Sequence, residues 1–271
     1  MELIDTHCHI QDIGSDTVGV ASKWANAGIE SVSAVIGAAA NAGVSTLVCV
    51  GCSLEDSSRA VSISAQYESL WASIGIHPHE AGDFLRHSQQ SEFTELLGTE
   101  PRSRKIIAIG ECGLDHHYNN SEKSDQVAVL EFQLKLATDL DLPVIFHVRE
   151  AFDEFWPILR NFPGISGVLH SFTDSLDNME RALKAGFYLG VNGIATFNRD
   201  EELLSMYKSI PLSKLLLETD SPYLTPNPIR GKINTPENVT YITKYMAELN
   251  NLSPEQVAEA TTANARNLFR I

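Results

Sequence analysis

The stretch Leu3-Ile4-Asp5-Thr6-His7-Cys8-His9 begins as a short apolar strand and ends in two histidines separated by one residue. An open, doubly wound α/β sheet normally carries a Gly-rich phosphate turn after its first strand, and His7-Cys8-His9 stands there instead. Residues two apart on a strand point to the same side, so His7 and His9 can share one ion while Cys8 faces away. The stretch therefore favours a barrel, in which reactive side chains gather at the carboxyl ends of the strands.

Short apolar strands alternate with amphipathic helices along the rest of the chain. Apolar residues recur at helical spacing over 127–137 and 176–183, and Ser253-Pro254-Glu255-Gln256 has the capping-box pattern that opens a C-terminal helix. Such alternation indicates parallel strands covered by helices. Eight units in 271 residues predict an α/β fold, a (β/α)8 TIM barrel formed by residues 1–271 as a single domain. The expected strands are Leu3 to Thr6, Ser45 to Val50, Trp71 to Ile76, Lys105 to Gly110, Pro143 to Val148, Gly167 to Leu169, Phe187 to Val191 and Lys214 to Glu218.

The composition and net charge indicate which kinds of molecule the chain can bind. The chain is 43% apolar and 20% charged, which is globular and excludes disorder and collagen. It carries 35 acidic against 20 basic residues, a formal net charge of -15. This balance argues against a broad basic surface for coating duplex nucleic acid, although a local basic patch or a metal can still bind phosphate.

Membrane insertion and export are not expected. The N-terminus carries an acid where a secretory signal needs positive charge, and it has no apolar run of signal length. Residues 31–54 carry no charge, but their Ala-rich and β-branched halves predict a buried helix followed by a buried strand. Four cysteines are too few to staple this chain, which favours a reducing cytoplasm, and Cys49-Val50-Gly51-Cys52 is interpreted as a packed strand end rather than half a zinc site.

Residues of metal-ligand type stand at the same end of several predicted strands. A lone histidine is more often structural, but this set occurs at five separate strand ends. Four imidazoles and two carboxylates exceed the three protein ligands of a single catalytic zinc, so two divalent ions are expected. We assign His7, His9 and Asp220 to one ion and His147 and His170 to the other, with Glu111 bridging. Imidazole and carboxylate ligands suit Zn, Mn, Fe or Co, and Mg is less favoured.

Phosphate also requires cationic or hydrogen-bonding groups near the metals. Arg149 stands two residues past His147, and a guanidinium can grip phosphate in a bidentate manner; a surface ion pair with Glu150 or Asp153 is the alternative. The other cationic candidates are Arg230 and Lys232 in a Pro-rich segment, with a solvated loop charge as the alternative. His77 and His79 follow the third strand and can hydrogen-bond either substrate phosphate or carboxylates that support the metal ligands, whereas a direct ligand role is less expected because the other six residues suffice. His116 and His117 are interpreted as histidines of an exposed loop.

The chain carries, in this order, the motifs Asp5-Thr6-His7-Cys8-His9, Gly75-Ile76-His77-Pro78-His79, Gly110-Glu111-Cys112-Gly113-Leu114-Asp115, His147-Val148-Arg149-Glu150, His170-Ser171-Phe172, Leu217 to Leu224, Arg230 to Asn234 and Asn264 to Phe269. Together these motifs resemble the successive signatures of the TatD family of metal-dependent deoxyribonucleases. The match covers essentially the whole chain in order. Small departures are Val148 and Glu150 around Arg149, and Ser221 where Ala is usual, which bear on substrate preference rather than on the chemistry.

The resemblance implies an amidohydrolase-like barrel that hydrolyses DNA phosphodiesters with divalent metals, Mg, Mn or Zn, often as a 3′ to 5′ exonuclease on single strands. The family's ligand positions fall on the same six residues reached from the strand ends. The expected mechanism has a metal-activated water attacking phosphorus, with Asp220 as general base and Glu111 as the second catalytic carboxylate. Because the chain is acidic, the expected substrates are DNA ends or short oligonucleotides, and no obligate protein partner is evident.

Two other functions are alternatives to the nuclease. Related barrels that also begin with His-x-His act as amidohydrolases on a small cyclic amide or ester, but many of these use a modified Lys at the fourth-strand end, where this chain has Glu111. A non-catalytic metal-binding or interaction protein with a decayed site would have lost at least one ligand, and all six are present.

Overall fold

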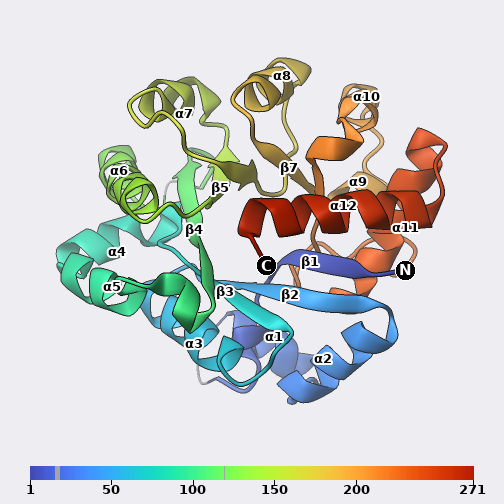
Figure 1. Ribbon diagram of the computed structural model, residues 1–271, viewed down its shortest axis with the longest axis horizontal. Helices are drawn as coiled ribbons and strands as arrows, with labels where there is room; N and C mark the ends of the chain where they lie inside the picture. The colour runs from blue at the N-terminus through green and yellow to red at the C-terminus, as the bar shows by residue number, and fades with distance from the viewer. Residues whose placement is uncertain (16–18, 119) are drawn as a thin grey trace. The chain divides into compact units, whose positions relative to one another are not determined.

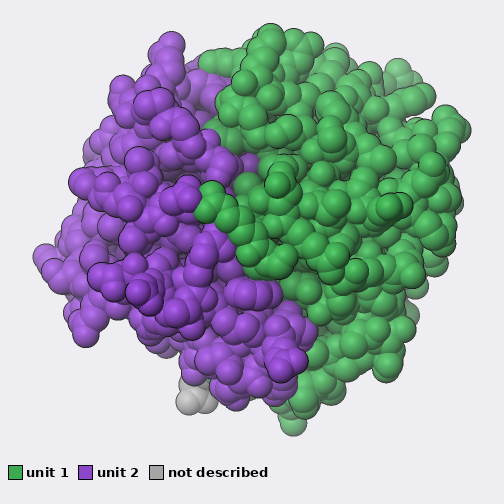
Figure 2. Space-filling model, in the orientation of Figure 1, with its two compact units in different colours: residues 1–49, 171–271 green, residues 50–170 purple. Residues whose placement is uncertain are grey.

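The computed structural model describes residues 1–15, 19–118 and 120–271, which form two compact units. Unit 1 comprises Met1–Cys49 and Ser171–Ile271, and unit 2 comprises Val50–His170; Figure 2 colours them separately. The strands are β1 (Leu3–Cys8), β2 (Val44–Val50), β3 (Leu70–Ile74), β4 (Ile106–Asp115), β5 (Val144–Arg149), β6 (Gly167–Leu169), β7 (Tyr188–Val191) and β8 (Leu215–Leu217).

Helices follow the strands in alternation, as labelled in Figure 1. The α-helices are α1 (Val20–Asn26), α2 (Val32–Asn41), α3 (Leu54–Ser64), α4 (Ala81–Arg86), α5 (Gln90–Leu97), α6 (Lys123–Asp139), α7 (Phe152–Leu159), α8 (Leu176–Lys184), α9 (Ile194–Phe197), α10 (Glu201–Ser209), α11 (Val239–Asn250) and α12 (Pro254–Phe269). Short 3-10 turns lie at Ile10–Asp12, Pro78–Glu80, Pro101–Arg104, Leu212–Lys214 and Pro236–Asn238.

The strand order is β1-β2-β3-β4-β5-β6-β7-β8, and all eight predicted strands are present. Within unit 1, β1 pairs with β2 and β7 pairs with β8, both in parallel, and Cys8 makes a parallel bridge with Ser221, just past β8. The last strand therefore lies beside the first, as a closed barrel requires and an open doubly wound sheet does not. The predicted (β/α)8 fold is confirmed.

Unit 2 contains the longest strand. β4 runs in parallel between β3 and β5 and extends five residues past the predicted end at Gly110, to Asp115. All ten of its residues are buried. Glu111 therefore lies inside the strand rather than after it, and alternation places Asp115 on the same side as Glu111.

The local predictions for helices are confirmed in part. Ser253 and Gln256 form a capping box at the start of α12, which packs beside β1 (Figure 1). Residues 31–54 do divide into a helix and a strand, but α2 buries only Val35 and Ala39, so its prediction as a buried helix is wrong. The Ala-rich helix is tolerated at the surface because alanine exposes little apolar area and has the highest helix propensity. No helix among the described residues is long and apolar enough to cross a bilayer.

Gly113 shows how tightly β4 and β5 approach. It is paired with His147, and a Cβ built on Gly113 would overlap the carbonyl group of His147. We expect Gly113→Ala to lower the free energy of unfolding by about 1–3 kcal/mol, because the two strands would have to separate locally. Urea unfolding followed by circular dichroism measures this.

The matched control is Gly37→Ala, in the exposed face of α2, where a Cβ meets no atom within 4 Å. It should raise the free energy of unfolding by about 0.5–1 kcal/mol, because alanine loses less conformational entropy than glycine in a helix. A Gly113→Ala variant as stable as the wild type would contradict the close approach.

Candidate metal centre

In unit 1, two imidazoles face one carboxylate oxygen. His7 and His9 stand on and just after β1, and Asp220 follows β8. Asp220 Oδ1 lies 3.2 Å from His9 Nε2 and 3.7 Å from His7 Nε2. The backbone N–H of Asp220 donates to the carbonyl oxygen of His7 at 2.8 Å, which joins the two strand ends directly. The structure thus brings together the three residues that the sequence assigns to the first ion.

Asp220 adopts a backbone conformation that few residues favour. Its φ of 57° lies in the left-handed region, which costs free energy for a non-glycine residue and which aspartate tolerates better than most. Neighbouring hydrogen bonds hold this segment. Asp5 Oδ1 accepts from the backbone N–H of Thr219 at 2.8 Å, and Asp5 Oδ2 accepts from Thr219 Oγ1 at 2.6 Å. Burial raises the pKa of Asp5 to about 7, against the lowering effect of the hydrogen bonds from Thr219.

In unit 2, one carboxylate oxygen faces three imidazoles. Glu111 Oε1 lies 2.8 Å from His147 Nδ1 and 3.8 Å from the Nε2 atoms of His77 and His170. Glu111 is only 4% exposed. An ion bound at about 2.1 Å to two ligands holds their atoms within roughly 4 Å of each other, so this donor set fits a divalent metal. His77, predicted to contact phosphate, is placed among the candidate ligands.

The pKa values of His77 and His147 shift in opposite directions. Burial, together with the nearby His147, holds the pKa of His77 well below its usual value. Burial also opposes the charged form of His147, but hydrogen bonds with Asp115 and Glu111 outweigh it and raise its pKa. The two carboxylates beside His147 therefore favour its protonated form.

Asp115 is a residue of the site that the sequence analysis missed. Its Oδ2 lies 3.1 Å from Nε2 of both His147 and His79. Its Oδ1 accepts hydrogen bonds from the backbone N–H groups of His117 and Tyr118. Burial alone would raise the pKa of Asp115, but the hydrogen bond from His147 and those backbone groups hold it well below its ordinary value. The sequence did contain a signal for Asp115, because it follows Glu111 by four residues. Residues an even number apart on one strand point to the same side, as His7 and His9 do.

The predicted phosphate-binding residues are placed in three settings. His79 bonds Asp115, and Arg149 is exposed at the end of β5 with its guanidinium carbon 4.7 Å from the centre of the Tyr118 ring. Glu150 pairs with His117 at 2.6 Å, so the alternative of an Arg149–Glu150 surface pair is not observed among the described residues. In unit 1, Arg230 lies over the Phe197 ring at 3.7 Å, and Lys232 is exposed in the same segment.

The cysteines divide into structural and site-adjacent residues. Cys8, Cys49 and Cys112 are buried, and all four cysteines are free thiols. Cys52 is partly exposed, and its Sγ lies 3.6 Å from Glu111 Oε2. The interpretation as a packed strand end holds for Cys49, whereas Cys52 lies beside the candidate ligand of unit 2.

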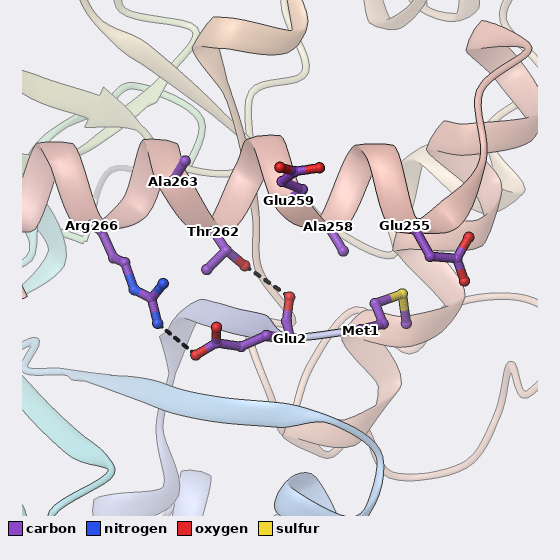
Figure 3. Close-up of a pocket in the computed structure, with 8 residues that line it drawn as sticks. All are labelled: Met1, Glu2, Glu255, Ala258, Glu259, Thr262, Ala263 and Arg266. Carbon is purple, nitrogen blue, oxygen red and sulfur yellow. Dashed lines mark hydrogen bonds and ion pairs between the residues drawn. The ribbon is translucent and has the colours of Figure 1, made fainter.

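The pocket drawn in Figure 3 lies elsewhere, in unit 1 beside α12 and the start of β1. It has a volume of about 510 Å³ and contains the ion pair of Arg266 with Glu2 at 2.6 Å and the hydrogen bond from Thr262 Oγ1 to the Glu2 carbonyl. Glu2 precedes β1, so the pocket is at the amino end of that strand, where conserved features of a barrel serve stability rather than catalysis. Its lining residues are Met1, Glu2, Glu255, Ala258, Glu259, Thr262, Ala263 and Arg266.

Comparisons with known proteins show the family to which the chain belongs. A family model described as TatD related DNase matches residues 4–270. The chain is 35% identical to the uncharacterized metal-dependent hydrolase YabD of Bacillus subtilis over 99% of both chains. It is 34% identical to the 3′-5′ ssDNA/RNA exonuclease TatD of Escherichia coli K12, over 88% of this chain and 92% of that one.

Solved structures give the same result. The crystal structure of YjjV, a TatD homologue from Escherichia coli K12, matches with a TM-score of 0.82 and 30% identity over 99% of this chain and 98% of the other. A TatD family hydrolase from Entamoeba histolytica shares the fold with a TM-score of 0.87 at 23% identity, over 99% and 98% of the chains. The resemblance inferred from the sequence motifs is confirmed, and the chain belongs to the TatD family of metal-dependent hydrolases.

Proposed function

We propose that this enzyme removes nucleotides from the ends of single-stranded DNA, as a 3′ to 5′ exonuclease that uses two divalent ions. The observation that carries the proposal is the donor set of unit 2, in which Glu111 Oε1 faces nitrogen atoms of three imidazoles. The relative from Escherichia coli K12 is named as an exonuclease on ssDNA and RNA, so RNA ends of equal length are the second substrate to compare.

Residues 1–271 are proposed to work as one catalytic domain. His7, His9 and Asp220 would hold one ion, His147 and His170 the other, and Glu111 would bridge. The proposal rests on the strand order, because the carboxyl ends of parallel strands in a barrel carry the active site. When bound, two divalent ions supply an activated water and neutralise charge on phosphoryl oxygens.

The residues of the chain have distinct tasks in this mechanism. Asp220 accepts the proton of the attacking water through its carboxylate, which His7 and His9 already face. Asp115 accepts the Nε2–H of His147, which orients that ring and leaves Nδ1 directed at Glu111. Arg149, Arg230 and Lys232 are proposed to hold phosphates of the strand, and His79 to support Asp115.

An assay on end-labelled single-stranded DNA tests the proposed function. Chelator treatment should abolish release of mononucleotides, and Mn, Mg or Zn added back should restore it. Glu111→Ala and Asp220→Ala should each reduce the rate on the order of 10³-fold, which corresponds to about 4 kcal/mol of transition-state stabilisation. Label placed at either end reports the polarity of digestion.

Gly37→Ala, which is remote in sequence from every candidate ligand and is expected to stabilise the fold, is the matched control and should retain wild-type activity. Wild-type activity in both Glu111→Ala and Asp220→Ala would contradict the proposed mechanism. Turnover of a small cyclic amide or ester, with no release of nucleotides, would favour the amidohydrolase function that the sequence left open.

Asp115 is tested separately through metal affinity. We expect Asp115→Asn and Asp115→Ala to weaken binding of the ion at His147 by about 10–100-fold, because the ring loses the carboxylate that fixes its orientation. Competition with a chromophoric chelator measures this without any turnover. Asp139→Asn, an exposed acid of α6 that pairs only with Lys135 among the described residues, is the control. Equal metal affinity in the wild type and both Asp115 variants would exclude the orienting role.

A further inference from the structure

Tyr118 is one of the few large apolar side chains among the described residues that are exposed. It is 54% exposed, and among the described residues only Met1 and Leu176 are other large hydrophobic residues with comparable exposure. An exposed aromatic ring at a nucleic-acid enzyme's rim is a ready surface for an unpaired base, because every base has an apolar face that can stack.

Contacts to both the backbone and the ring hold Tyr118 in place. The backbone N–H of Tyr118 donates to Asp115 Oδ1 at 3.0 Å. The rings of His79 and His117 meet it edge to face, with centroids 5.6 and 4.7 Å away. The Arg149 guanidinium lies over it at 4.7 Å. Because these contacts already order the ring, a base that stacks on it loses little further side-chain entropy.

Tyr118 is connected to the candidate metal ligands of unit 2 by one short series of contacts. His79, which touches the Tyr118 ring, shares Asp115 Oδ2 with His147, and the His79 and His147 ring centroids are 6.4 Å apart. His147 in turn bonds Glu111. A stacked strand advances roughly 3.4 Å per nucleotide, so a base on Tyr118 lies within a few nucleotides of the ligands.

The charge beside Tyr118 suits the backbone of the same strand. Arg149 is exposed, and the acid that follows it, Glu150, pairs with His117. In a chain of net charge -15, a cation placed next to an exposed aromatic ring is a specific feature rather than part of a basic surface. Arg149 can stack on the ring and still offer its N–H groups to a phosphate.

We propose that Tyr118 and Arg149 form a stacking subsite for one unpaired base and its adjoining phosphate. The inference rests on the proposed function and deepens it, because it gives the physical basis for a preference for single strands. Bases inside a duplex are covered by their neighbours on both faces, whereas a base near a single-stranded end is free to stack on Tyr118. The subsite tolerates any base, since stacking does not read hydrogen-bonding edges.

Binding measured without turnover tests the subsite. Fluorescence anisotropy of labelled octathymidylate with the full-length protein, in EDTA to prevent hydrolysis, should give a Kd about tenfold higher for Tyr118→Ala. Tyr118→Trp and Tyr118→Phe keep an aromatic ring and should retain wild-type affinity. A general loss of folding on substitution of Tyr118 would not give this difference. Leu176→Ala, which removes another exposed apolar side chain, at the start of α8, should leave the Kd unchanged.

Arg149→Gln separates the phosphate contact from stacking. It should weaken binding of octathymidylate and reduce the slope of log affinity against log salt by about one, because one phosphate contact is lost. Lys208→Gln, which removes an exposed cation from α10, is the charge control and should change neither quantity.

An oligonucleotide series carrying one abasic nucleotide at successive positions locates the stacked base. In the wild type, one position should raise the KM for hydrolysis about tenfold, and in Tyr118→Ala that position should have no effect. Octathymidylate affinity within twofold of wild type in Tyr118→Ala would overturn the subsite, whether or not hydrolysis is observed. Absence of hydrolysis by the wild type, with the binding difference intact, would instead overturn the proposed function alone.

Discussion

The hydrogen bonds that hold His147 between two carboxylates are the interaction on which the candidate site of unit 2 depends. Its Nδ1 lies 2.8 Å from Glu111 and its Nε2 lies 3.1 Å from Asp115. A neutral imidazole carries one N–H, so both contacts are favourable only when the ring is protonated or when one nitrogen and its carboxylate share a cation. Two nearly buried acids at one imidazole therefore require positive charge, and a divalent ion meets that requirement.

The backbone of β4 and of the turn that follows it positions the groups around His147. β4 continues to Asp115, and Gly113, between the two acids, lets β5 approach so closely that a side chain would collide with His147. The turn after β4 then folds back, with the N–H groups of His117 and Tyr118 on Asp115. One carboxylate thus orients a candidate ligand and also positions the loop that carries the exposed ring.

Unit 1 reaches a similar arrangement by different means. There the carboxylate follows the strand, and its positive φ directs Asp220 Oδ1 towards His7 and His9. The cost of that backbone conformation is offset by the buried hydrogen bonds between Asp5 and Thr219. In each unit a buried aspartate, Asp5 or Asp115, supports the carboxylate or imidazole that faces the candidate ion.

The amino-acid sequence by itself determined the eight strands, the class of the fold and the residues of ligand type, because strand alternation and strand-end placement are local properties. Alternation states on which side a residue lies, but it does not state how deeply an element is buried, so the exposure of α2 could not be predicted. Likewise Asp115 was visible in a motif, yet its role follows only from the approach of His79 and His147, which are distant in the chain. The pairing of Tyr118 with Arg149, and the position of Cys52 beside Glu111, were decided by the tertiary structure alone, because contacts between separate loops depend on how parallel strands align.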